Sequence, residues 1–300
     1  MALTRSALDY FYENRKPYIE EVVSQFREHP TLFRQFLNSK SAKSGWIDTN
    51  SVSGFGTFNT KAEMVDADSD DIIQGPSMRS AVVTYAKRHL VSQEAIEDDQ
   101  GDGIIASRLP EILFAGRATQ EILGHDILNS GFTTAVPTPD GVALFSDSHS
   151  NLSGTAGDNL LGAVDLTEDN LGTAVNMLQT MTNDRNIPIF QNARTLIVHP
   201  TLQWTAEKIL KSAQEPGTDY NAINPMASQG IKLVVTPYLT TEYNWFLLAD
   251  MHKLDWYDRI QMQNWSEVDY RKSAVEVGAR FRSVAVTHDW RGAVASNDSS

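Results

Sequence analysis

A stretch of nearly forty residues, 41–78, shows little hydrophobic pattern although it lies inside an otherwise patterned chain of 300 residues. Serine, glycine, asparagine, threonine and aspartate dominate it, and Phe55 and Phe58 stand in a glycine-spaced part of it. A long loop within a compact domain is usually functional or disordered. A long two-stranded hairpin that projects from the body also fits. Because a lone hairpin is marginal in water, it would need a surface to lie on.

The first forty residues carry short apolar stripes with helical spacing. Pro17 and Pro30 break the region into pieces, so we expect several short helices. The last of them would place Phe33 and Phe36 on one apolar face. Helices this short cannot bury such stripes alone, so we expect this region to lie against another surface.

A strand and then a long helix are expected after the loop. Valine and tyrosine residues favour a strand over 80–91. The helix after this strand runs to about Asn129 and has an apolar stripe at helical spacing. Pro110 should kink this helix, and Gly131 is a plausible stop signal.

The middle of the chain changes from turns to an alternation of helices and strands. Residues 132–165 are rich in proline, glycine and aspartate. The pattern beyond them predicts a helix capped by Thr167, a buried strand at 195–198, a helix opened by Pro200, and apolar strands at 231–235 and 245–248.

The last part of the chain is β-structured by its pattern. Residues 254–262 and 275–282 alternate apolar and polar side chains. A period of two with one polar face is typical of half-buried antiparallel strands. Taken with the helices, these strands predict an α+β fold.

Composition excludes several classes of protein. The chain has no cysteine, so disulfides and cysteine-based metal sites are excluded. No apolar run approaches the roughly 18 residues of a membrane span. The formal net charge of −13 repels nucleic acid phosphate and argues against sequence-specific DNA binding.

Two motif-like spacings lack the context that their chemistry needs. Gly101 and Gly103 have the spacing of a dinucleotide fingerprint, but an acidic run precedes them where a strand should stand. The spacing of Asp66, Asp68 and Asp70 resembles a calcium loop. Asp71 occupies the position of the required glycine there, so a solvated acidic turn is favoured. Such a turn would suit a basic patch on a neighbouring subunit.

The residue types of a hydrolase triad occur together at 146–149. Adjacent residues cannot easily converge as nucleophile, base and orienting acid, which normally come from separate segments. The chain has neither a nucleophile elbow nor a His-Glu-x-x-His pattern. We therefore expect no catalytic residue, no cofactor and no metal.

A resemblance to a known family rests on the segment Phe145-Ser146-x-x-His149-x-Asn151-Leu152. It is similar to a loop in the Mu-like major head subunit family of tailed phages. The segments downstream of it come in the same order as in that family: an Ala-Arg-Thr-Leu-Ile-Val-x-Pro stretch at 193–200, then Asn-Pro, Thr-Pro-Tyr-Leu and Trp-Phe-Leu-Leu-Ala-Asp segments. The resemblance covers roughly residues 80–290.

This resemblance implies the Hong Kong 97-type capsid fold and its parts. Mapped onto this chain, the expected parts are an N-terminal arm at 1–48, an extended loop at 49–84, a peripheral domain at 85–164 with a spine helix at 103–129, an axial domain at 165–250, and return strands of the peripheral domain with a C-terminal tail at 251–300.

The resemblance also implies a function. The chain would be a major capsid protein that forms hexamers and pentamers of an icosahedral phage head around double-stranded DNA, without sequence specificity. A portal and separate scaffold or decoration proteins would be partners, with assembly in the bacterial cytoplasm. The expected interface residues are Phe33, Phe36, Phe55, Phe58, Lys61, Asp66, Asp68, Asp70 and Asp71. The alternatives are a bacterial nanocompartment shell of the same fold and, less favoured, an α/β hydrolase.

Overall fold

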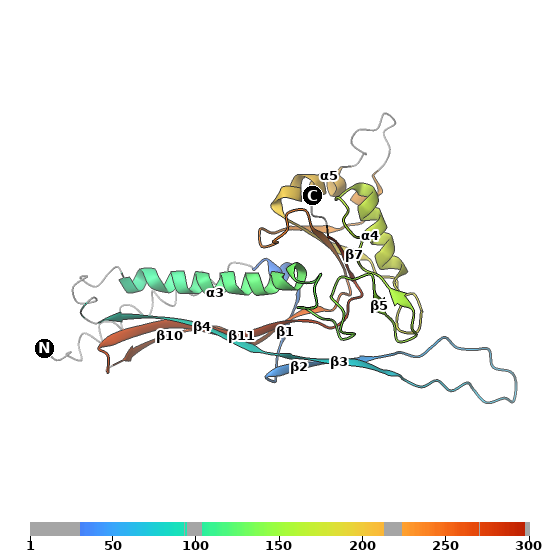
Figure 1. The fold of residues 1–300 in the computed structure, drawn as a ribbon, viewed down its shortest axis with the longest axis horizontal. Helices are drawn as coiled ribbons and strands as arrows, with labels where there is room; N and C mark the ends of the chain where they lie inside the picture. Colours follow the sequence, from blue (N-terminus) through green and yellow to red (C-terminus); the bar gives the residue numbers. More distant parts are fainter. Residues whose placement is uncertain (1–30, 93, 95–103, 213–223, 270, 298–300) are drawn as a thin grey trace.

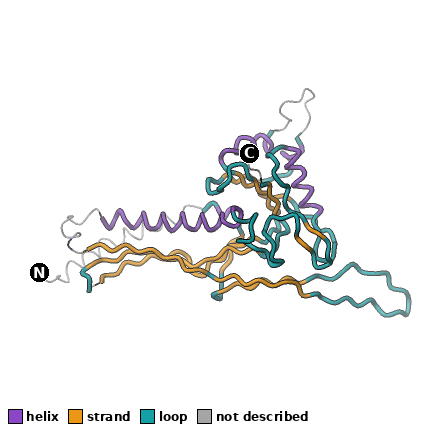
Figure 2. The backbone as a smooth tube through the Cα atoms, in the orientation of Figure 1, coloured by secondary structure: helices purple, strands orange, loops and turns teal. Residues whose placement is uncertain are grey.

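The computed structural model describes residues 31–92, 94, 104–212, 224–269 and 271–297, and the side chains of 104–109 lie outside that description. An elongated part holds a long helix on a long sheet, and a second lobe rises at one end of it (Figure 1). A hairpin projects past this lobe (Figures 1 and 2). The expected α+β fold is confirmed.

The elongated part is a four-stranded sheet in the order β1-β10-β11-β4. β10 pairs with β11 and β11 with β4 in antiparallel fashion, whereas β1 runs parallel to β10. The strands are β1 (Asn38–Ser41), β10 (Leu254–Asp269), β11 (Ala274–Thr287) and β4 (Val83–Ser92). The two alternating segments predicted at the end of the chain form the centre of this sheet.

Helix α3 (Ile104–Asn129) lies along one face of the sheet (Figure 1). Ile112 and Leu113 of the helix pack against Val277 and Ala279 of β11. The helix continues across Pro110, so this proline does not end it.

The second lobe is built on a sheet in the order β12-β9-β7-β8. Its strands and helices are β7 (Ala193–Val198), β8 (Lys232–Val235), β9 (Trp245–Ala249), β12 (Ala293–Ser296), α4 (Glu168–Thr180), α5 (Gln203–Lys211), η2 (Pro200–Leu202) and η3 (Pro225–Ser228). Thr167 is the predicted N-cap, and its hydroxyl accepts a hydrogen bond from the amide of Asn170 at 3.2 Å. The apolar faces of both helices and the strands form one core.

Strand β12 refines the expected division of the chain. Return strands of the peripheral domain and a C-terminal tail were expected at 251–300, and β12, which lies in that tail, pairs with β9 in the second lobe. The reason is burial, since all four residues of β12 are buried there.

The hairpin consists of β2 (Trp46–Val52) and β3 (Gln74–Ala81), joined by residues 53–73. It begins and ends three residues earlier than the expected loop at 49–84. The strand expected at 80–91 is divided, because the chain leaves the hairpin at Val82 and enters the sheet as β4.

The region before the hairpin differs from expectation where it is described. A 3₁₀ turn, η1 (Phe33–Gln35), and β1 replace the end of the expected helical region, and the rest of the expected helices lies outside the described residues. Phe33 and Phe36 are buried in the chain's own core, with exposed fractions of 0% and 2%, and therefore are not free interface anchors.

Glu121 of α3 is the physical reason for this placement. Its carboxylate accepts hydrogen bonds from the amides of Leu32 at 2.7 Å and Phe33 at 3.1 Å. The ring of Phe33 then lies 4.5 Å from that of Trp256. The turn approaches α3 at Gly124, where an added Cβ would lie 2.5 Å from the Cβ of Phe33.

Gly124→Ala should destabilise the subunit because the added methyl group meets a buried side chain that cannot move away. We expect a loss of roughly 1–3 kcal/mol in unfolding free energy, as is usual for overpacking, measured by urea denaturation of the purified protein. Gly116→Ala is the matched control on the same helix. Its Cβ would meet only the flexible end of Met262, so equal losses in both variants would contradict this explanation.

Candidate assembly site

The tip of the hairpin, residues 53–73, is apolar and exposed. Seven large apolar side chains of the tip and its flank are more than 40% exposed: Val52, Phe55, Phe58, Met64, Val65, Ile72 and Ile73. Phe58 and Met64 have no cover at all, at 102% and 99%. Exposed large apolar side chains that gather on one projecting segment point to an interaction site.

The tip is also acidic. It carries five carboxylates and one lysine, Lys61, which gives it a formal charge of −4. Asp68 accepts a hydrogen bond from Asn59 at 2.7 Å, and Asp70 accepts one from the amide of Gly56 at 2.7 Å. This amide lowers the pKa of Asp70 below its usual value, with help from Arg185.

Arg185 holds both arms of the tip. Its guanidinium donates to the carbonyl oxygen of Gly54 at 3.1 Å, to the carboxylate of Asp70 at 3.1 Å, and to the carbonyl oxygen of Asp71 at 2.5 Å. Arg185 comes from the turn 182–188 of the second lobe, which a β-bridge between its ends closes. The hairpin is therefore tied to the second lobe of its own chain.

A second tie lies at the base of the hairpin. The hydroxyl of Thr49 in β2 lies 2.6 Å from Nδ1 of His288, and Nε2 of His288 lies 3.2 Å from Asp255. Burial raises the pKa of Asp255, but hydrogen bonds from His288, Lys40 and Asn38 outweigh burial and bring it to about 2. The carboxyl group of Asp255 is thus ionised at neutral pH and lies at the base of the hairpin.

Leu152 of the family-like segment forms a shelf under the hairpin. A Cβ built on Gly75 of β3 would lie 3.1 Å from the end of the Leu152 side chain, so the two are in close contact. Asn151 accepts a hydrogen bond from Arg291, which also pairs with Asp184 at 2.7 Å. Arg291 thereby joins the shelf to the turn 182–188, which carries Arg185.

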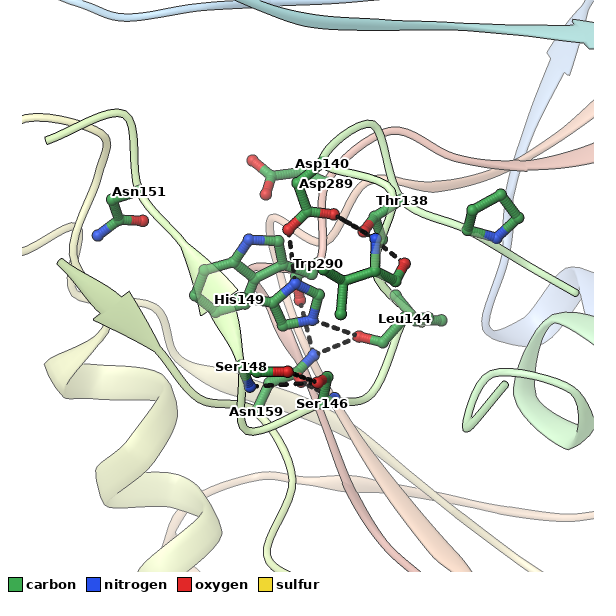
Figure 3. A network of polar contacts seen from close by, with 12 residues as sticks. Thr138, Asp140, Leu144, Ser146, Ser148, His149, Asn151, Asn159, Asp289 and Trp290 are labelled. Carbon is green, nitrogen blue, oxygen red and sulfur yellow. Dashed lines mark hydrogen bonds and ion pairs between the residues drawn. The ribbon is translucent and has the colours of Figure 1, made fainter. Parts of the chain in front are cut away.

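The first part of the family-like segment, from Phe145 to Ser148, supports the fold. Phe145 is buried, and its ring lies 5.4 Å from that of Phe246. The amide of Ser146 donates to Asn159 at 2.9 Å, and the hydroxyl of Ser146 lies 2.8 Å from that of Ser148 (Figure 3).

His149 does not form a triad with these serines. Its Nδ1 lies 2.7 Å from the carboxylate of Asp140, and its Nε2 lies 3.1 Å from the carbonyl oxygen of Leu144 (Figure 3). Both ring nitrogens are therefore occupied, and no hydroxyl group lies on either. Within the described ranges, no three histidine or acidic side chains form a group that could hold a metal ion.

The open face of the long sheet carries arginines. Val277 and Ala279 face α3, so the alternate residues Arg280 and Arg282 face away from it. Arg88 of β4 lies beside Gly278 on the same face and pairs with Glu276 at 3.0 Å. In the described part of the chain Arg280 makes no ion pair, and Nε of Arg282 is buried without a hydrogen-bond acceptor.

The structure thus gathers seven of the nine expected interface residues, Phe55, Phe58, Lys61, Asp66, Asp68, Asp70 and Asp71, on one loop. Phe33 and Phe36 lie apart from them in the core. Sequence reasoning missed Arg185, Thr49 and His288. The only local signal for Arg185 is a charged residue within a polar turn, which does not indicate its partner.

Arg185→Ala should loosen the tip without unfolding the subunit. Hydrogen exchange of the 53–73 amides should become about tenfold faster, since the opening of a local unit sets that rate, while the overall unfolding free energy should change by less than about 1 kcal/mol because the ion pair is partly exposed. Arg194→Ala, an exposed arginine of the same lobe, is the control. Unchanged protection of the tip in Arg185→Ala would show that Arg185 does not hold it.

Comparison with known proteins agrees with this architecture. A family described as phage capsid protein matches residues 76–296. None of the described helices is long and apolar enough to cross a membrane. A sequence comparison with curated proteins gives no significant match.

Three solved structures illustrate the likeness in fold. The capsid of a native GTA particle has a TM-score of 0.60 at 11% identity and covers 91% of this chain and 92% of its own. The capsid of the cyanophage P-SCSP1u gives 0.59 at 10% identity, with 89% and 88% covered. The holo-SrpI encapsulin complex from Synechococcus elongatus PCC 7942 gives 0.54 at 12% identity, with 89% and 87% covered. With its helix, long sheet, second lobe and hairpin, the chain belongs to the phage capsid protein family and has the Hong Kong 97-type capsid fold.

Proposed function

We propose that many copies of this chain assemble as hexamers and pentamers into an icosahedral phage head that encloses double-stranded DNA. The single observation that carries the proposal is the exposed apolar tip of the hairpin. In the terms of the fold family, 31–45 would be the described part of the arm, 46–81 the extended loop, α3 the spine helix, the long sheet the peripheral domain and the second lobe the axial domain.

Within the described part of the chain, the apolar side chains of the tip are left exposed. The tip lies past the second lobe, while the long sheet extends in the opposite direction (Figure 2). A two-stranded hairpin alone is marginal in water, so contact with another molecule would stabilise it. Shell subunits of the expected kind bury roughly 2,000–5,000 Å² or more in such obligate contacts.

The surface that suits the tip best is the open face of the long sheet in a second copy. The tip is acidic, and that face carries Arg88, Arg280 and Arg282 beside the half-exposed Leu90. Opposite charges steer association and fix its register. Because tip and face lie toward opposite ends of the molecule (Figure 1), the contact joins copies head to tail, and head-to-tail contacts close into rings at a suitable angle.

The charge of the chain suits a DNA container. A net charge of −13 disfavours adhesion to packaged phosphate. Portal, scaffold and decoration proteins are further partners under this proposal, and assembly takes place in the host cytoplasm.

A second candidate function is a nanocompartment shell with protein cargo. The observation that favours it is the likeness to the encapsulin complex, which has the same fold. Particles isolated from the native source distinguish the two, because a phage head contains nuclease-protected DNA and a nanocompartment contains an enzyme.

The hydrolase alternative has no support in the geometry. Nε2 of His149, which would have to activate Ser146, lies on the carbonyl oxygen of Leu144.

Negative-stain electron microscopy of the chain expressed alone should reveal shells, tubes or capsomer sheets. The substitutions Arg88→Glu and Arg280→Glu together reverse two charges on the open face of the long sheet. They should raise the critical concentration for assembly about tenfold, which corresponds to a loss of roughly 1.4 kcal/mol per contact. Adding Glu63→Arg with Asp66→Arg, whose carboxylates have no partner in the described chain, should restore assembly.

The matched control reverses two charges outside that face, Arg271→Glu with Lys272→Glu in the β10–β11 turn. If the control weakens assembly as much as the double substitution on the open face of the sheet, that face does not bind the tip. If the wild-type chain remains monomeric at millimolar concentration and with crowding agents, self-assembly itself is contradicted.

A further inference from the structure

Helix α3 carries an apolar stripe that the described part of the chain leaves uncovered. Phe114, Ala118 and Ile122 follow one another at intervals of four residues, which places them on one face of the helix. Phe114 is 68% exposed and Ile122 is 58% exposed. At 3.6 residues per turn, this face lies opposite Ile112 and Leu113, which pack on the sheet. The stripe therefore points away from the sheet and takes no part in the core beneath the helix.

We propose that this stripe is a docking site for residues 18–29 of the same subunit. These residues lie outside the described part of the chain. In sequence they place Ile19, Val22, Val23 and Phe26 at the spacing of one helical face. The inference goes beyond the proposed function and does not depend on shell formation.

The first described residues of the chain lie on α3 beside the stripe. The amide of Leu32 donates to Glu121 at 2.7 Å, and the ring centroids of Phe36 and His125 lie 5.0 Å apart. From residue 32 to residue 36 the chain thus advances along α3 toward the end of the helix. Traced backward from Leu32, the same direction leads toward the stripe.

The distances along the helix match the length of the connecting chain. Phe114 precedes Glu121 by about two turns, which is roughly 10 Å and nearly the same face. The chain between Phe26 and Leu32 spans up to about 20 Å when extended. As a helix, residues 18–29 would be about 18 Å long, whereas α3 extends about 25 Å ahead of Glu121. The segment therefore reaches the stripe and fits along it.

Attachment favours the same subunit over a second copy as the source of the segment. The bond from Leu32 to Glu121 holds the end of the segment next to the stripe. A segment joined to its site by a short linker has an effective concentration of about millimolar, and a second copy would have to compete with it. Docking then covers the stripe, so that the hairpin tip rather than α3 is available to other copies.

Photochemical cross-linking tests the docking directly. Phe114→p-benzoylphenylalanine keeps an aromatic side chain on the stripe, and ultraviolet light couples its benzophenone to the groups that touch it. We expect an adduct with the mass of a single chain, in which tandem mass spectrometry finds residues 18–29 attached to the α3 peptide. An adduct between two chains, an adduct to another segment, or no adduct would overturn the proposal.

The control for cross-linking is Trp204→p-benzoylphenylalanine. Trp204 is 70% exposed and lies on α5 in the second lobe, so this variant should not capture residues 18–29. Both variants are informative whether or not shells form, because the mass of the adduct separates contacts within a chain from contacts between chains.

Limited proteolysis measures how firmly the stripe holds the segment. Trypsin cleaves after Arg27, and a docked segment must first leave its site. Phe114→Ser removes the largest side chain of the stripe, so we expect cleavage after Arg27 to become about tenfold faster than in the wild-type chain. Trp204→Ser removes a similarly exposed aromatic side chain elsewhere and should leave this rate unchanged. Equal rates in all three proteins would show that the stripe does not hold the segment.

Discussion

The buried guanidinium of Arg291 joins the parts of the molecule on which the hairpin depends. It is 9% exposed and donates to the carbonyl oxygen of Thr182 at 2.9 Å and to Asp184 at 2.7 Å, besides Asn151. Leaving a buried charge without its partner costs about 3–5 kcal/mol. The loops that surround Arg291 are therefore held in one arrangement, and Arg185, the residue after Asp184, is directed to the tip of the hairpin.

The parts of the fold that were predictable from sequence are those that one stretch of chain determines. The alternation in β10 and β11 and the stripe of α3 reflect burial on one side, which imposes a period on the sequence. Thr167 marks its helix because the cap bond spans only three residues. A projecting hairpin was one of the structures that fit the weak hydrophobic pattern between residues 41 and 78.

The remaining features depend on contacts that no local pattern encodes. Phe33 is held by Glu121, 88 residues away, and Arg185 meets Gly54 across 131 residues. Aromatic character predicts that Phe33 is buried but not in which subunit. For the same reason the sequence did not reveal that β12 joins the sheet of the second lobe, since three apolar residues and a serine fit either sheet.

Satisfied and unsatisfied groups are unevenly distributed over the described part of the chain. Catalytic sites bring together, in a cleft, polar groups that still have hydrogen-bonding capacity for a substrate. Here both nitrogens of His149 are occupied in the interior, while exposed apolar and charged groups lie on the tip and on the open face of the sheet. Arg185 and Thr49 hold the hairpin to its own subunit at two points. If tip and sheet join successive copies, the angle between those copies is set within each subunit before they meet, and a fixed angle is what a closed ring requires.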